Sequence, residues 1–388
     1  MRDRTTQNRR HVLLSTLDLV VDDKTSAIAI AVISILLSLI AAAIFLLLMK
    51  TNPFEAFEAL LKASGFRAKA RYSLNQGMLT DFTGFLGILA PMILSALGVI
   101  IAMRTGLFNI GISGQMIAAA SIATVCIGYS GLPSVLAKPL VIVIGIVVGG
   151  ALGALVGFLK YRFNINEVVS TIMINYIVNY VAGFFINTYY IDIITRSSLV
   201  CTEEARLTIQ GRTLFGQQVT FPIGIVLAFA SVFIIRFLLN RTTLGYELKA
   251  VGLNRDSARY AGIHVGSRMV IAMFISGMFA GLAGVTYYVG HFNTIVPKDL
   301  PAMGYDAIAV SLLGNLDPVG SIFASIIITI FQRGSVYMSS VTGVPKEITA
   351  VVTGIILVFS ACGTYMRAVA NKQRDRLLET SIKKQGSC

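Results

Sequence analysis

The residues best suited to chemistry in this 388-residue chain are uncharged amides and hydroxyls within or beside long apolar runs. Segment 105–115 reads TGLFNIGISGQ, and its glycines would weaken a continuous helix. Asn175 and Asn179 lie one helical turn apart on one face. Amides donate and accept hydrogen bonds, which suits a solute with hydroxyl groups and ring nitrogens. The predicted substrate-pathway residues are Phe108, Asn109, Ser113, Gln115, Asn175 and Asn179.

Segment 105–115 also lies next to an apolar run. At membrane depth, backbone that is not helical is tolerated only where it is buried in protein or lines a watery cavity. This placement favours a polar pathway. The alternative is that the same amides hydrogen-bond between helices or cap them, without touching a solute.

The chain carries none of the usual signs of an internal energy source or a catalytic centre. It has no Gly-Lys dipeptide and hence no phosphate-binding P-loop. Asp306 is the ionisable residue that we single out within the predicted spans, whereas an ion-coupled secondary transporter normally keeps several. The three histidines lack metal-ligand spacing. We predict no catalytic residue, no metal and no cofactor bound by this chain, and keep the secondary transporter as an alternative.

One enzyme hypothesis remains. Gly111-Ile112-Ser113-Gly114 matches the G-x-S-G pattern around the nucleophile of rhomboid-type intramembrane proteases. A serine nucleophile needs a neighbouring base, and His291 is the candidate. Short patterns of this kind arise easily by chance in a chain with 35 glycines, so we treat the protease as a remote alternative.

The elements that must position these residues are apolar helices. Hydrophobic residues make up 55% of the chain and charged residues 13%, half of the roughly 25% typical of soluble domains. The mean hydropathy is +0.76. Most apolar runs reach the roughly 17–25 residues that cross a bilayer. This excludes a soluble enzyme, a disulfide scaffold and a disordered protein. We predict an all-α polytopic membrane protein with ten transmembrane helices, at 25–49, 82–103, 114–133, 139–159, 168–191, 219–235, 269–290, 303–313, 319–332 and 347–366.

The distribution of charge predicts the orientation. With both termini inside, inner segments hold 20 of the 32 Lys and Arg residues, as the retention of positive charge in the cytoplasm favours. The net charge of +13 is therefore attributed to topology and not to nucleic-acid binding. We predict a transmembrane domain over 25–366 between cytoplasmic tails at 1–24 and 367–388.

Two further features describe architecture and docking. Glycine recurs every fourth residue in the fourth span, which predicts a helix-packing face formed by Gly145, Gly149, Gly153 and Gly157. The largest inner loop, 236–268, contains a short piece that ends at Gly252 and a helix 255–261, capped by Asn254 and ended by Gly262. Such a helix could be a plain surface feature. In a transporter without its own energy source, it is the best candidate for a docking element.

Together these segments resemble the permease subunits of ATP-binding-cassette (ABC) importers for ribose-type sugars and nucleosides. The likeness is closest to the longer permease of the basic membrane lipoprotein-linked nucleoside uptake systems. It is carried by GLFNIG at 106–111 with Gly114-Gln115, by NEVVSTIM at 166–173 with Asn175-Tyr176, by GLN at 252–254 with YAGI at 260–263, and more weakly by DAIAV at 306–310. The chain departs from the family at Ser113, commonly Glu, and at Ser257, commonly Ala.

The resemblance implies a type II-like importer fold in the cytoplasmic membrane of a prokaryote. It implies a second permease subunit, favouring a different chain, cytoplasmic ABC ATPases that hold ATP and Mg²⁺, and an extracytoplasmic substrate-binding lipoprotein. Membrane lipid is then the surrounding medium, and nucleic acid is not a partner. The solute would be a nucleoside or a related simple sugar. The loop 236–268 would couple to the ATPase through Gly252, Asn254, Ala258, Tyr260, Ala261 and Gly262.

Overall fold

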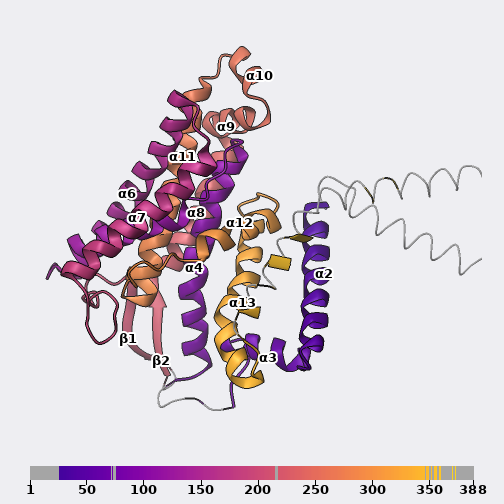
Figure 1. Cartoon of the computed structure of the whole chain (residues 1–388), viewed down its shortest axis with the longest axis vertical. Coiled ribbons are helices and arrows are strands. Elements are labelled where there is room, and N and C mark those ends of the chain that lie inside the picture. Colours follow the sequence, from indigo (N-terminus) through magenta and orange to yellow (C-terminus); the bar gives the residue numbers. More distant parts are fainter. Residues whose placement is uncertain are drawn as a thin grey trace, which may run out of the picture.

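The computed structural model describes residues 26–70, 76–214 and 217–345, together with Tyr72 and a few isolated positions between 347 and 372. Helices dominate these residues, and most run between two ends of the molecule (Figure 1). The first half contains α2 (Ser26–Leu48), α3 (Pro53–Ala63), α4 (Met78–Arg104), α5 (Ile112–Ala123) with its π-helical extension η1 (Thr124–Gly128), α6 (Ser134–Phe163) and α7 (Glu167–Tyr189).

A β-hairpin separates this half from the second. The hairpin consists of β1 (Thr208–Leu214) and β2 (Gln217–Pro222). It is followed by α8 (Ile223–Arg241), α9 (Thr243–Leu253), α10 (Arg255–Tyr260), α11 (Val265–Val285) with its π-helical extension η2 (Thr286–Phe292), α12 (Met303–Leu313) and α13 (Gly320–Thr342). The hairpin lies at one end of the molecule, here called the hairpin end, and α10 lies at the other, the α10 end (Figure 1).

Six helices of the described chain are long and apolar enough to cross a membrane: α4, α6, α7, α8, α11 with η2, and α13. A seventh span results if α2 and α3, bent by 118°, count as one. The helical multi-span prediction is confirmed at this level. The predicted third and eighth spans correspond to the shorter helices α5–η1 and α12. Most of the tenth, 347–366, lies outside the described residues, as do both predicted tails apart from Val369 and Lys372. Ten spans and cytoplasmic termini stay predictions.

Helix α4 forms the centre of the bundle. In its most apolar stretch 89% of the residues are buried, against 39% in α6, α7 and α8. Large aliphatic side chains such as Met92, Ile93 and Leu97 are completely enclosed. A helix that is apolar on every side is typical of such a buried position, whereas the outer helices expose apolar side chains along one face.

The glycine face of α6 lies against a matching face of α11. A Cβ atom added to Gly149 would lie 2.7 Å from the Cα of Gly281, and one added to Gly157 would lie 2.9 Å from the Cα of Val270. A Cβ atom at Gly153 would lie 3.0 Å from the carbonyl carbon of Met273, and one at Gly145 would lie 3.2 Å from the carbonyl oxygen of Gly281. Close packing of small residues is the main source of helix association in lipid, where no hydrophobic force draws helices together.

The hairpin covers the start of α4. β1 and β2 pair antiparallel from Thr208 with Pro222 to Leu214 with Gln217, with an irregularity between Ile209 and Arg212. The Gln217 side chain accepts a hydrogen bond from the backbone N–H of Leu79 at 3.1 Å. The predicted sixth span began at 219, but α8 begins at Ile223 because the preceding residues belong to β2.

Candidate functional site

The predicted pathway residues gather where the chain leaves α4 and starts α5. Asn109 is only 1% exposed. Its Nδ2 donates to Gln115 Oε1 at 3.1 Å and to Ser276 Oγ on α11 at 2.8 Å. Its Oδ1 accepts from the backbone N–H of Gly111 at 2.9 Å. One amide therefore fixes the turn before α5 and ties it to α11.

Asn175 performs the same task from α7. Its Oδ1 accepts from the N–H of Gly114 at 2.8 Å, and its Nδ2 donates to the carbonyl oxygen of Ile110 at 2.9 Å. The first N–H groups of a helix have no partner inside that helix, so Asn175 supplies one from a neighbour. A Cβ atom at Gly114 would lie 2.6 Å from Asn175 Oδ1 and 2.7 Å from its Cα, which explains the glycine there.

The other predicted pathway residues lie nearby. Ser113 Oγ donates to the carbonyl oxygen of Pro301 at 2.8 Å. Gln115 is buried, and its Nε2 has no hydrogen-bond partner among the described residues. Asn179 is buried on α7 one turn beyond Asn175, and Phe108 is half-buried. In this arrangement Asn109, Ser113 and Asn175 bond to protein groups, so their role toward a solute stays a prediction.

Ser113 does not form a nucleophile–base pair with His291. Its hydroxyl is directed at a backbone carbonyl, and the His291 imidazole lies against Gly87 of α4, where an added Cβ would be 2.5 Å from Nδ1. Within the residues that the structure describes, no group of three or more His, Cys, Asp or Glu side chains could hold a metal ion.

The predicted docking helix is α10, at the far end of the molecule (Figure 1). Asn254 caps it by accepting from the N–H of Ser257 at 2.9 Å, and Gly262 ends the turn with a left-handed φ of +82°. Ala258 anchors the helix inward, with 3% exposure. Tyr260 is 94% exposed, so the tip presents a large aromatic side chain to its surroundings.

The docking helix rests on the turn that leads to the amide cluster. A Cβ atom at Gly252 would lie 2.9 Å from the carbonyl carbon of Arg104 and 3.1 Å from the N of Gly106. Arg255 Nη2 donates to the carbonyl oxygen of Gly106 at 3.0 Å. Because Gly106 and Asn109 belong to the same short turn, direct contacts connect α9 and α10 to the segment before α5.

Sequence reasoning missed a second group of polar residues, toward the hairpin end. The predicted ninth span ended at 332, but α13 continues to Thr342 and places Arg333 inside the helix. Likewise α4 begins at Met78, so Asp81 lies in its first turn. Lys69 Nζ contacts Asp81 at 2.7 Å, and Arg333 Nη2 lies 3.9 Å from the same carboxylate. The sequence signal for this group is that the helical pattern of 319–332 continues beyond the charged residue at 333.

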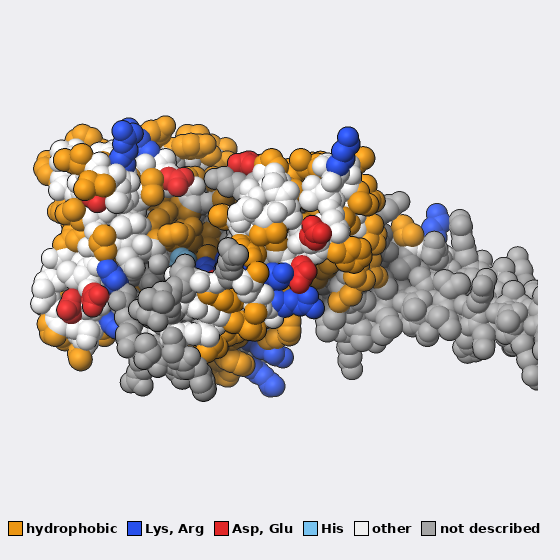
Figure 2. Space-filling view, turned by 90° about the horizontal axis from the view of Figure 1, so that it is seen from below, with side chains coloured by type: hydrophobic (Ala, Val, Ile, Leu, Met, Phe, Trp, Pro, Cys, Tyr) orange, Lys and Arg blue, Asp and Glu red, His pale blue; other side chains and the backbone are white. Residues whose placement is uncertain are grey.

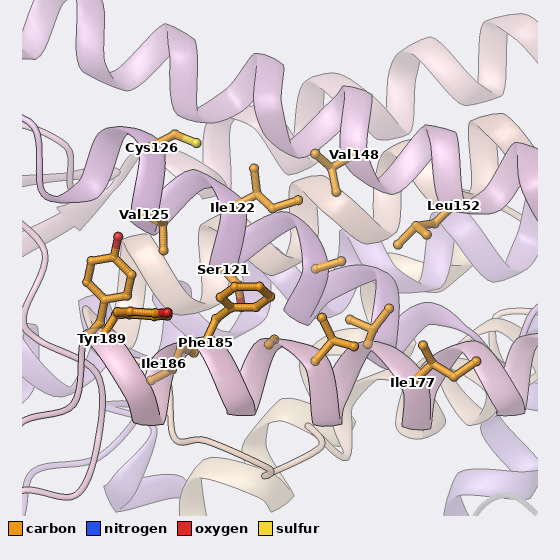
Figure 3. A pocket seen from close by; sticks show the side chains of 15 residues that line it. Ser121, Ile122, Val125, Cys126, Val148, Leu152, Ile177, Phe185, Ile186 and Tyr189 are labelled. Atoms are coloured by element: carbon orange, nitrogen blue, oxygen red, sulfur yellow. The ribbon is translucent and has the colours of Figure 1, made fainter.

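An apolar cavity with a volume of about 790 Å³ lies between α5–η1, α6 and α7 (Figure 3). Ile122, Leu152, Ile177 and Phe185 point into it, and Tyr189 lies at one end. Such a lining offers few hydrogen bonds to a polar solute, so this cavity is better suited to acyl chains or another apolar helix.

Comparison with known proteins places these features in a family. Residues 82–361 match the family described as branched-chain amino acid transport system / permease component. The nucleoside ABC transporter permease protein NupB of Lactococcus lactis is 31% identical, over 94% of this chain and 99% of its own length. The guanosine ABC transporter permease protein NupP of Bacillus subtilis is 32% identical, over 74% of this chain and 83% of its own length. The glucose ABC transporter permease protein TsgB13 of Haloferax volcanii is 22% identical, over 69% of this chain and 73% of its own length.

Proposed function

Because this chain belongs to the branched-chain amino acid transport system / permease component family, we propose that it is the membrane-spanning subunit of an ATP-driven importer of nucleosides. A related simple sugar is the second solute class. The observation that carries the proposal is the match to a nucleoside permease over nearly the full length of both chains. The buried polar residues are uncharged hydroxyls and amides, which agrees with a neutral solute.

Energy comes from separate ABC ATPase subunits, which hold ATP and Mg²⁺. Tyr260 of α10 and Leu253 at the end of α9 are 94% and 88% exposed, and this tip enters a groove on the ATPase. The α10 end then faces the cytoplasm, and both termini lie on that side. Gly252 and Arg255 contact the turn at Gly106, so a displacement of α10 shifts the start of α5. Alternating access follows from the changed packing of α5 against α7 and α11.

The solute arrives at the hairpin end from an extracytoplasmic substrate-binding lipoprotein. When α5 and α7 separate, Asn109, Asn175 and Asn179 exchange protein partners for the solute. A second permease subunit, a different chain, completes the pathway. Lipid of a prokaryotic cytoplasmic membrane covers the apolar outer faces of helices such as α7, where Tyr180 and Phe184 are exposed.

The proposal is tested by gentle purification of the chain from its native membrane. We expect an ABC ATPase and a substrate-binding lipoprotein in the preparation, and uptake of labelled guanosine that stops when ATP is depleted but survives collapse of the proton gradient. Isolation of the chain alone, with uptake that follows the gradient, would establish the secondary transporter instead.

The docking element has its own test. Deletion of 254–262 removes α10 and its cap but no membrane helix. We expect insertion into the membrane at the normal level and loss of ATP-dependent uptake. Normal uptake by this variant would show that α10 does not transmit energy.

A further inference from the structure

Two glycines on α4 make room for two basic side chains from distant parts of the chain. A Cβ atom at Gly87 would lie 2.5 Å from Nδ1 of His291 on η2, and one at Gly84 would lie 2.8 Å from Cζ of Arg333 on α13. Gly84 and Gly87 are three residues apart and therefore share a face of the helix. The basic groups reach the backbone of α4 because these two positions carry no side chain.

These glycines line a small polar cavity near the hairpin end, with a volume of about 120 Å³. Thr83 contributes from α4, Thr208 and Thr220 from the hairpin, and His291 and Asn293 from η2 and the residue after it. We call this the outer polar cavity. Seen from the hairpin end, the molecule has a hollow between two lobes (Figure 2). The pale blue of histidine and the blue of Lys or Arg are visible at the bottom of this hollow.

Polar groups of the outer polar cavity lack partners. Thr208 Oγ1 and Asn293 Oδ1 are buried and receive no hydrogen bond from the part of the chain that the structure describes. Nor does any described residue hydrogen-bond the imidazole of His291, whose ring contact is an edge-on one with Phe292. Buried polar atoms in folded proteins are nearly always paired. Unpaired acceptors around a cavity therefore indicate a ligand that brings donors.

The charged side chains beside the outer polar cavity are bonded to protein groups. Asp81 faces both Lys69 and Arg333, and Arg333 Nε also donates to the carbonyl oxygen of Ala63 at 3.2 Å. Asp306 accepts a hydrogen bond from Gln332, the neighbour of Arg333 on α13. A third cation, Lys138, donates from Nζ to the carbonyl oxygen of Thr208 at 3.2 Å, so each of these three cations already has a protein partner. Ionisable side chains inside a membrane protein face a cavity or each other and commonly mark a solute pathway.

We propose that the outer polar cavity is a solute-binding site, where one polar ring of a neutral solute is held as it enters from the hairpin end. The inference rests on the proposed function and deepens it by naming the site. A volume of about 120 Å³ is below the ~300 Å³ of sites for drug-sized ligands, so this state receives a sugar ring or a base but not both. His291, Thr208 and Asn293 are its hydrogen-bonding residues.

This site differs from the predicted amide pathway. Asn109 and Asn175 bond to protein groups in the same structure, whereas the outer polar cavity has open donors and acceptors. The two can act in sequence, because α4 carries Gly84 and Gly87 in its first half and leads into the Asn109 turn at its other end.

The test uses the complete transporter, with its ATPase and partner permease, reconstituted in lipid vesicles and supplied with labelled guanosine or labelled ribose. Gly87→Ala places a methyl group in the space of the His291 ring, and His291→Leu removes its hydrogen bonds. We expect each change to raise the KM for uptake about tenfold, the effect of losing a buried hydrogen bond. His291→Gln, which still donates and accepts, should recover most of the affinity.

Gly131→Ala is the matched control, because no described atom lies within 4 Å of the added methyl group and its φ is not positive; it should keep the wild-type KM. A KM within twofold of wild type for both Gly87→Ala and His291→Leu would overturn the site while leaving the importer intact. Absence of ATP-dependent uptake of either probe by the wild-type complex would overturn the proposed function, and this inference with it.

Discussion

The contact between α9 and the end of α4 allows the coupling route to be tested by a single methyl group. Gly252→Ala would press a Cβ against the carbonyl oxygen of Arg104 and place it 2.9 Å from the carbonyl carbon, whereas ordinary contact begins at 3.4 Å. The two backbones must therefore separate by more than the 0.5 Å that the contact with the carbonyl carbon alone requires. A separation of this size lengthens the 3.0 Å bond from Arg255 to Gly106 to 3.5 Å, the limit of a useful hydrogen bond.

Overpacking of this kind costs about 1–3 kcal/mol. A loss of 1.4 kcal/mol from the coupling between α10 and α5 corresponds to about a tenfold lower rate of uptake. The exposed tip at Tyr260 is unchanged, so the ATPase should still copurify. Labelled-guanosine uptake and ATPase recovery are measured together in cells that lack the native chain, with Gly131→Ala as the control.

Uptake by Gly252→Ala at the wild-type rate, with normal expression, would refute the proposed route from α10 to α5. Loss of the ATPase from the purified complex would also refute this route. Gly252 would then be needed for the ATPase to bind, and not for movement to pass from α10 to α5.

Two further predictions concern the interior. Gly149→Leu inserts a side chain where the α6 and α11 backbones touch, and should abolish stable insertion, read as loss of the folded protein on detergent size exclusion; normal elution would show that the two helices separate readily. Asn109→Leu leaves the N–H of Gly111 and the Ser276 hydroxyl without their partner. It should lower the stability of the chain by about 1–3 kcal/mol and alter uptake, while the ATPase still assembles. Unchanged uptake and an unchanged melting temperature would contradict both expectations.

Features that depend on neighbouring residues could be predicted from the sequence. The Asn254 cap and the turn at Gly262 form within a few residues, so α10 was placed correctly to within one residue. The apolar runs predicted a helical membrane protein, and the glycines of α6 predicted a packing face. Its partner α11 is more than 100 residues away in the chain, and only the structure identifies it.

Tertiary structure alone decided which apolar helix is central and where charge enters the bundle. A helix that faces lipid can be as apolar as one that faces protein: the mean hydropathy is 2.5 for the buried α4 and 2.6 for the more exposed α6, so hydropathy does not distinguish the two. The predicted spans end where an apolar run meets a charged residue, so Asp81 and Arg333 were left outside them. In the folded chain both residues lie within helices and contact each other. The outer polar cavity is likewise built from α4, the hairpin and η2, with α13 beside it. Its parts meet only because long-range packing brings distant segments together, and no local pattern records that contact.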